Sequence, residues 1–116
     1  MNPSEITSLS LSELQSQLRS GTLHAVDVLD ALAAEIDRVD PSIDACLDYD
    51  LKTARNLAEK ADPSLPLGGL PIGIKDNINV KGQPLTCASN ILQGYTALYD
   101  AGVISRLRTA GAIPFG

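Results

Sequence analysis

The stretch Gly68–Gly82 reads GGLPIGIKDNINVKG and decides the fold of this chain. Its apolar part, Pro71–Asp76, has the character of a β-strand set between glycine-rich turns. Side chains alternate across a strand, so Gly73 and Lys75 lie on the face opposite Asp76. Lysine inside a strand is energetically unfavourable, because an ammonium buried without a partner loses its hydration. The stretch therefore raises the question of what Lys75 does.

The residues alone suggest three roles for Lys75, of which one is rejected. A phosphate-binding loop is rejected, because that motif places its lysine directly after a glycine and here Ile74 intervenes. Pro71 also removes one of the N–H donors that such a loop needs. An exposed strand lysine whose ammonium reaches water is the default role. The third is a buried lysine that has lost its proton, because a neutral amine activates a serine nucleophile.

Length, composition and charge limit the class of protein. The 116 residues suffice for one domain, and 44% hydrophobic with 20% charged residues is typical of a globular protein. The N-terminus has no signal-peptide pattern, and no apolar run is long enough to cross a bilayer. The net charge of −5 is uneven, since residues 1–63 carry −7 and residues 64–116 carry +2. The acidic half argues against a direct grip on nucleic-acid phosphates, which need clustered Lys and Arg.

The cysteines and the histidine do not form a metal-site pattern. Cys46 and Cys87 are far apart and belong to no C-x-x-C pair, and His24 is the one histidine. We interpret the cysteines as two reduced thiols, although their spacing does not exclude a disulfide. His24 lies near the start of a predicted helix, where a lone histidine has a structural role.

Residues 1–63 are predicted to be mainly helical. Ser10 and Glu13 form a capping-box pattern before a helix that Gly21 ends. The other elements expected here are a helix at 22–41 that Pro41 ends, a short strand at 45–49 and an amphipathic helix at 50–62.

Residues 64–116 are predicted to follow the order strand, helix, strand. A loop rich in proline and glycine at 63–71 precedes the strand at Pro71–Asp76. The helix at 100–111 is expected to have Val103, Leu107 and Ala110 on one side, and a second strand follows at 112–116. This order indicates an α/β architecture.

Two blocks carry a resemblance to a known family. The segment LPLGGLPIGIKDNINVKGQPLTCASNIL, at 65–92, closely resembles the start of the amidase signature family. Within that family, TCASNILQGY at 86–95 and YDAGVISRLRTAGAIPFG at 99–116 are most similar to the A subunits of aspartyl/glutamyl-tRNA amidotransferases. Gly102, where the family usually has a β-branched residue, and Pro114 in the last strand are departures that do not touch the chemistry.

The resemblance implies an organisation in two parts. Residues 1–63 would be an N-terminal helical segment, and residues 64–116 would be the start of the mixed-sheet catalytic core of the amidase signature fold. We expect that core to be incomplete in this chain, which ends on a fresh apolar strand.

The resemblance also implies a catalytic set of a nucleophilic serine, a second serine in a cis peptide, and a lysine. Lys75 matches the family's lysine, whereas neither serine has a match before Gly116. Ser89 is interpreted as a loop hydroxyl that satisfies nearby backbone, and Asp76 as a carboxylate that supports the DNIN loop. Cys87 is assigned to packing, since no histidine lies nearby to ionise it. We therefore expect this chain alone to be inactive.

The function that the resemblance implies belongs to a complete subunit. That subunit would hydrolyse glutamine and pass ammonia to a B subunit, which uses ATP and Mg²⁺ to activate the amino acid on Glu-tRNA(Gln) or Asp-tRNA(Asn). A small C subunit would complete a cytoplasmic heterotrimer in protein biosynthesis, a carbon–nitrogen ligase with glutamine as amido donor. No cofactor or metal is expected in this chain itself, and no membrane association.

Two other functions stay open at this point. One is an amidase-signature hydrolase that acts on small amides without tRNA. The other is a non-catalytic helical module whose acidic helices bind a partner protein.

Overall fold

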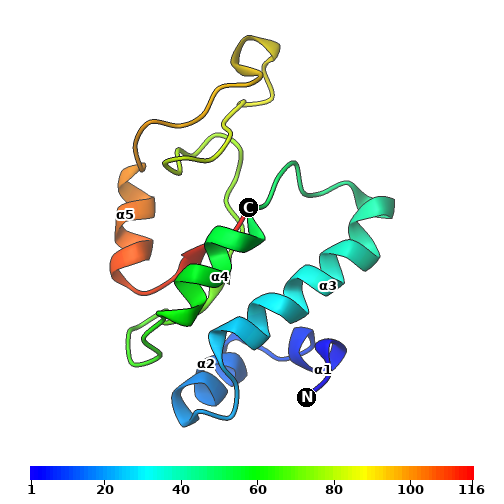
Figure 1. The fold of residues 1–116 in the computed structure, drawn as a ribbon, viewed down its shortest axis with the longest axis vertical. Coiled ribbons are helices and arrows are strands. Elements are labelled where there is room, and N and C mark those ends of the chain that lie inside the picture. The colour runs from blue at the N-terminus through cyan, green and yellow to red at the C-terminus, as the bar shows by residue number, and fades with distance from the viewer.

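A computed structural model describes residues 1–116 (Figure 1). Its elements are α1 (Pro3–Thr7), α2 (Leu11–Ser20), α3 (Ala25–Ile43), α4 (Leu51–Glu59), β1 (Pro71–Ile72), the 3-10 helix η1 (Asn90–Leu92), α5 (Gly102–Thr109) and β2 (Ile113–Pro114). The long segment between β1 and α5 extends away from the helices, and the C-terminus lies beside the start of α4. None of the helices combines the length and the apolar character that a membrane span requires.

The first helices start and stop where local capping chemistry dictates. The Ser10 hydroxyl accepts the N–H of Glu13 at 3.2 Å and the Glu13 carboxylate accepts the N–H of Ser10 at 2.7 Å. Gly21, with φ of 79°, ends α2, so both predicted boundaries of this helix are confirmed. Helix α1 was not predicted, although Asn2 and Glu5 form a second capping box around Pro3.

Two predictions at the end of α3 are wrong. The helix does not stop at Pro41 but continues to Ile43, so the proline is accommodated in the last turn of the helix. Asp44, with φ of 56°, ends the helix and donates its N–H to the carbonyl of Asp40 at 2.6 Å. The predicted strand at 45–49 is irregular, since the Asp40 carboxylate takes the N–H groups of the first two residues of that segment at 2.7 and 3.1 Å.

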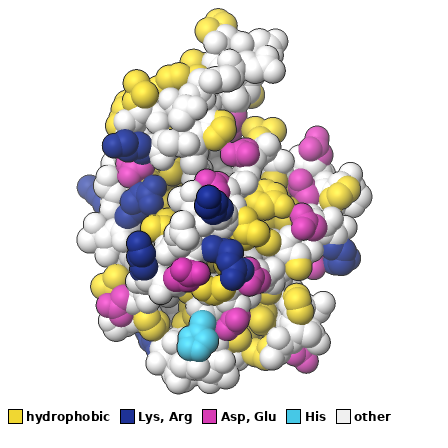
Figure 2. Space-filling model, viewed as in Figure 1, with side chains coloured by type: hydrophobic (Ala, Val, Ile, Leu, Met, Phe, Trp, Pro, Cys, Tyr) yellow, Lys and Arg dark blue, Asp and Glu magenta, His cyan; other side chains and the backbone are white.

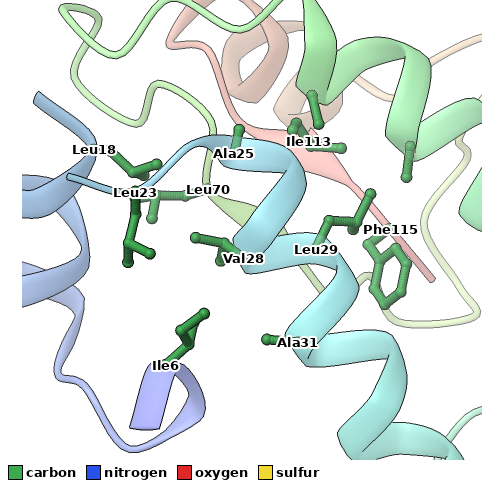
Figure 3. Packing of buried hydrophobic residues seen from close by; sticks show 12 residues of the cluster. Ile6, Leu18, Leu23, Ala25, Val28, Leu29, Ala31, Leu70, Ile113 and Phe115 are labelled. Atoms are coloured by element: carbon green, nitrogen blue, oxygen red, sulfur yellow. The ribbon is translucent and has the colours of Figure 1, made fainter. Parts of the chain in front are cut away.

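The core lies where α1, α2 and α4 surround α3 and the two strands. Figure 3 shows apolar side chains from these helices, Leu70 and β2 pointing into one interior. Leu29 is completely buried there, and the ring of Phe115 packs on Tyr49 with centroids 5.4 Å apart. Ala54 and Ala58 are the buried residues of α4, and their small side chains let that helix approach α3 closely. The core therefore joins residues from both predicted segments, and the boundary near residue 63 stays a prediction.

Helix α5 presents a different face from the predicted one. Ile104 is completely buried, whereas Val103 is 50% exposed and Leu107 is only partly buried. The helix packs against β2, and that tertiary contact decides which side of this short helix is covered. The apolar side that the sequence indicated through Val103 is therefore not the buried side, which contains Ile104.

The strands β1 and β2 form a parallel pair that agrees with the predicted α/β class. Pro71 is level with Ile113, and α5 lies on the crossover between the strands. The N–H of Ile113 donates to the carbonyl of Leu70 and the N–H of Phe115 to that of Ile72, both at 2.9 Å. Proline is tolerated at position 114 because alternate N–H groups of a strand point to opposite sides. The N–H groups of Ile113 and Phe115 point toward β1, so the N–H that Pro114 lacks would point away from it.

The regular part of β1 is shorter than the predicted strand at Pro71–Asp76. One further bond continues the pairing, from the N–H of Ile74 to the carbonyl of Gly116 at 2.6 Å. Beyond Ile74 the chain turns, because the N–H of Ile78 donates back to the carbonyl of Lys75 at 3.1 Å. Lys75 therefore stands directly after the carboxyl end of the paired segment.

Candidate active site

Lys75 is held at the carboxyl end of the parallel pair by its backbone. The preceding residue, Ile74, is bonded to Gly116, and the Lys75 carbonyl accepts the N–H of Ile78. The Lys75 side chain is exposed and takes part in none of the ion pairs or side-chain hydrogen bonds of the structure. In α/β proteins, ligands bind beyond the carboxyl ends of parallel strands, so a side chain that contacts a ligand is expected at this position.

A cavity of about 450 Å³ opens beside Lys75. Its walls are the irregular segment at 45–48, the turn after β1, and the chain near Val80 and Pro84. Gly73, which follows β1 and lines the same cavity, has no atom within 4 Å of where a Cβ would be, so this side of the chain is open as the predicted alternation implies. The volume lies within the range of small-molecule sites, which is about 300–1,000 Å³.

Asp76 binds a segment that is distant in sequence. Its carboxylate accepts the N–H of Thr86 at 2.9 Å and also the Thr86 hydroxyl, and its carbonyl accepts the N–H of Cys87 at 2.9 Å. The Thr86 hydroxyl and N–H hold the pKa of the Asp76 carboxyl below its usual value, so the group is ionised at neutral pH. Its partners are thus in the Thr-Cys-Ala-Ser block rather than in the DNIN loop that the sequence suggested.

Thr86 is the residue that sequence reasoning missed. The Thr-Cys-Ala-Ser block was visible, but nothing in a single sequence indicates that its threonine reaches back to the carboxylate after Lys75. The intervening turns at Gly82 and Pro84 were the available signal that the chain reverses there.

Residues Thr86–Ser89 form a tight turn in a strained conformation. The N–H of Ser89 donates to the carbonyl of Thr86 at 2.8 Å, and both central residues are left-handed, with φ of 50° at Cys87 and 57° at Ala88. A turn with positive φ at both central residues normally uses glycine or asparagine there. The Ser89 hydroxyl accepts the N–H of Ile91 at 3.2 Å and caps η1. Both cysteines are free thiols, Cys87 exposed and Cys46 partly buried.

Charges near the site are paired or dispersed. Asp100 accepts the N–H of Lys81 at 2.8 Å and the Nε–H of Arg108 at 3.0 Å, and these contacts lower the pKa of its carboxyl. On the face drawn in Figure 2, Lys and Arg are interspersed with Asp and Glu rather than gathered in one basic patch. No group of three or more His, Cys, Asp and Glu side chains is arranged to hold a metal ion. His24 precedes α3 and lines a separate hollow of about 290 Å³.

Comparison with known proteins shows the family. The model of the Amidase family matches residues 27–116, and the chain belongs to that family. It is 47% identical over 108 residues to the A subunit of the glutamyl-tRNA(Gln) amidotransferase from Methylacidiphilum infernorum (isolate V4), a match that covers 93% of this chain and 22% of that protein. The resemblance to such A subunits is therefore confirmed, for a chain that spans about a fifth of the relative's length.

Solved structures support the fold. The A subunit of the glutamyl-tRNA(Gln) amidotransferase from Thermotoga maritima is 28% identical, with a TM-score of 0.64, over 100% of this chain and 22% of that one. A fatty acid amide hydrolase has a TM-score of 0.89 at 22% identity, over 98% of this chain and 21% of that one, and at this identity the likeness shows the fold alone. The predicted fold class, the first part of an amidase-type α/β core preceded by helices, is confirmed.

Proposed function

We propose that this chain is the N-terminal segment of the glutamine-hydrolysing A subunit of a tRNA-dependent amidotransferase. The observation that carries the proposal is the placement of Lys75, with an unpaired ammonium beside a cavity at the carboxyl end of the parallel pair. The 47% identity to the A subunit of a glutamyl-tRNA(Gln) amidotransferase supports the choice of reaction. Lys75 is exposed here, and in the proposal the remainder of the full-length protein covers it and supplies both serines.

In this reaction Lys75 is the proton carrier. A serine hydroxyl attacks the carboxamide carbon of glutamine, and its proton passes through the second serine to the amine of Lys75. The ammonium then returns the proton to the leaving nitrogen, ammonia departs, and a glutamyl ester remains on the serine. Water hydrolyses the ester to glutamate with Lys75 again accepting a proton. Asp76 stays ionised and has no proton to give at neutral pH.

The remaining steps belong to partner subunits. In the proposed cytoplasmic heterotrimer, a B subunit uses ATP and Mg²⁺ to activate Glu-tRNA(Gln) or Asp-tRNA(Asn), and the ammonia released from glutamine attacks the activated carboxyl. A C subunit holds the two together. The acidic character of residues 1–63, with a net charge of −7, supports a division in which tRNA contacts lie mainly on the partner.

The test compares two ammonia sources in the assembled complex. With the full-length protein, Lys75→Ala should lower glutamine-driven tRNA amidation by about 10³-fold or more, by analogy with the loss of a base in serine hydrolases. Lys75→Arg should be nearly as inactive, because a guanidinium stays protonated. Amidation driven by free ammonia should stay within about twofold of the wild-type rate, since ammonia bypasses the proton carrier.

Lys81→Ala is the matched control, because Lys81 is also an exposed lysine whose side chain makes no hydrogen bond. It should retain the glutamine-driven rate. Substantial glutamine-driven activity in Lys75→Arg would show that Lys75 is not the proton carrier and that its side chain merely reaches solvent.

A second candidate is an amidase-type hydrolase that acts on small amides without tRNA. Membership of the Amidase family, whose model matches residues 27–116, favours it. Ammonia release from small amides by the full-length protein without B and C subunits, together with no tRNA amidation in their presence, would select this function.

A further inference from the structure

The segment that carries Lys75 is fastened to the turn at Thr86–Ser89 by three hydrogen bonds. Two run from the N–H and the hydroxyl of Thr86 to the Asp76 carboxylate, and one from the N–H of Cys87 to the Asp76 carbonyl. We call these three bonds the Asp76–Thr86 clamp. Because both the carboxylate and the backbone of Asp76 take part, the clamp restrains the position and the orientation of the peptide next to Lys75.

The clamp holds a turn that would not persist without support. Cys87 and Ala88 are not glycine, yet both have left-handed backbone angles. Such residues persist only where surrounding contacts enforce the conformation, and they cluster at functional sites. The Thr86 hydroxyl supplies part of that enforcement, because it donates to Asp76 and also accepts the N–H of Ala88 at 3.2 Å.

Lys75 itself has no anchor beyond its backbone. Its ammonium makes no ion pair or hydrogen bond, so the direction of the side chain depends on how the peptides on both sides are held. Before Lys75, the N–H of Ile74 donates to Gly116 at 2.6 Å, and after it comes the clamp. If the clamp is released, the lysine backbone keeps its strand side and the bond from the N–H of Ile78 to its carbonyl at 3.1 Å, but the peptide between Lys75 and Asp76 loses its connection to the Thr86 turn.

We propose that Asp76 and Thr86 are positioning residues that aim Lys75 into this cavity through the Asp76–Thr86 clamp. The inference rests on the proposed role of Lys75 as proton carrier. The two residues touch neither glutamine nor the transferred proton in this scheme, and they act only by fixing the lysine backbone. Proton transfer depends steeply on geometry, because a misplacement of about 1 Å costs about 100-fold in rate.

The experiment uses the full-length protein in its complex, with Thr86→Val as the main variant. Valine retains the shape and the N–H bond to Asp76 but removes the hydroxyl. We expect kcat for glutamine hydrolysis to fall about 10- to 100-fold while KM changes less than about threefold, since positioning affects the chemical step rather than binding. Thr86→Ser, which keeps the hydroxyl, should restore kcat to within about threefold of the wild type.

A second readout does not depend on activity. Limited acetylation with acetic anhydride, resolved by mass spectrometry, measures the reactivity of each lysine. Thr86→Val should change the rate at Lys75 more than about threefold, because the amine moves to a new environment, while Lys81 serves as internal reference and keeps its rate. Thr96→Val is the control variant, since Thr96 is exposed and its hydroxyl makes no hydrogen bond.

Each outcome decides the proposal. A Thr86→Val enzyme with wild-type kcat and unchanged Lys75 acetylation overturns it, even if its melting temperature falls, because the clamp is then only structural. If the wild-type complex hydrolyses no glutamine, the proposed function fails, and the acetylation rates still decide the positioning role. If Thr86→Val does not fold, Asp76→Asn is judged by the same two criteria, since it removes the charge and weakens the bond to the hydroxyl.

Discussion

Gly68 is the position where a single added methyl group should damage this fold most. A Cβ on Gly68 would lie 1.9 Å from the carbonyl oxygen of Asp62 and 2.9 Å from the Cα of Pro63. The first contact is about 1 Å shorter than real Cβ atoms tolerate, and both neighbours are backbone atoms that cannot rotate away. The loop after α4 would have to move as a unit.

The cost of that movement follows from the bonds that hold the loop. The N–H of Leu67 donates to Ala110 at 2.8 Å, the N–H of Gly69 to Gly111 at 3.0 Å, and the N–H of Gly68 to Leu65 at 3.1 Å. Loss of two such bonds costs about 1 kcal/mol each, and overpacking adds about 1–3 kcal/mol. Alanine also has less conformational freedom than glycine in the unfolded chain, and this stabilises the folded state by less than about 1 kcal/mol. The net effect of Gly68→Ala is therefore a free energy of unfolding that is lower by about 3 kcal/mol.

Hydrogen exchange by mass spectrometry on the full-length protein measures this locally. Peptides that span the loop should exchange about 100-fold faster in Gly68→Ala, the equivalent of about 3 kcal/mol. Gly73→Ala is the matched control, because nothing lies within 4 Å of its added Cβ and its φ is not left-handed. It should change the free energy of opening by less than about 0.5 kcal/mol. Equal exchange in the two variants would refute the reasoning from backbone overlap.

Two further predictions concern carboxylates outside the clamp. Asp50→Ala should lower the free energy of unfolding by about 1 kcal/mol, because the Asp50 carboxylate caps α4 by accepting the N–H of Thr53 at 3.0 Å. Asp50→Asn should restore most of this loss. Equal urea midpoints for the two variants would contradict the prediction. The Lys81 N–H and Arg108 lower the folded-state pKa of Asp100, so its stabilisation is present above its usual pKa and is lost as pH falls through the lower folded value. Asp100→Asn should therefore be less stable than the wild type at pH about 6 and lose less on acidification to pH about 3. Asp48→Asn is the control, because the Asp48 carboxylate makes no hydrogen bond. If Asp100→Asn loses as much stability on acidification as the wild type does, the Asp100 carboxylate does not make this contribution to stability.

Features that depend on a few neighbouring residues were readable from the sequence. The capping box at Ser10 and Glu13 and the stop at Gly21 follow from bonds between residues at most four positions apart. The two paired strands followed from short apolar runs between turn signals, and their order with the helix between them predicted the α/β class. Lys75 stood out because its charge interrupts such a run.

Features that depend on distant residues were decided only by the tertiary structure. The face of α5 was misassigned at Val103, because a helix of this length has several plausible apolar sides and only its contact with β2 selects the one that contains Ile104. The strand expected at 45–49 failed because strands need a partner, and here the Asp40 carboxylate takes the first N–H groups instead.

The candidate site divides in the same way. A motif indicates Lys75, but it does not predict the cavity beside the lysine, because segments separated by tens of residues form that cavity. The Asp76–Thr86 clamp is equally invisible in one sequence, since a carboxylate accepts N–H and hydroxyl donors from any part of the chain that the fold brings near. Local bonding rules therefore determined the caps of α2 and the approximate positions of the two paired strands, and a motif indicated the lysine, whereas the burial of each face and the partners of each polar group required the whole chain to be folded.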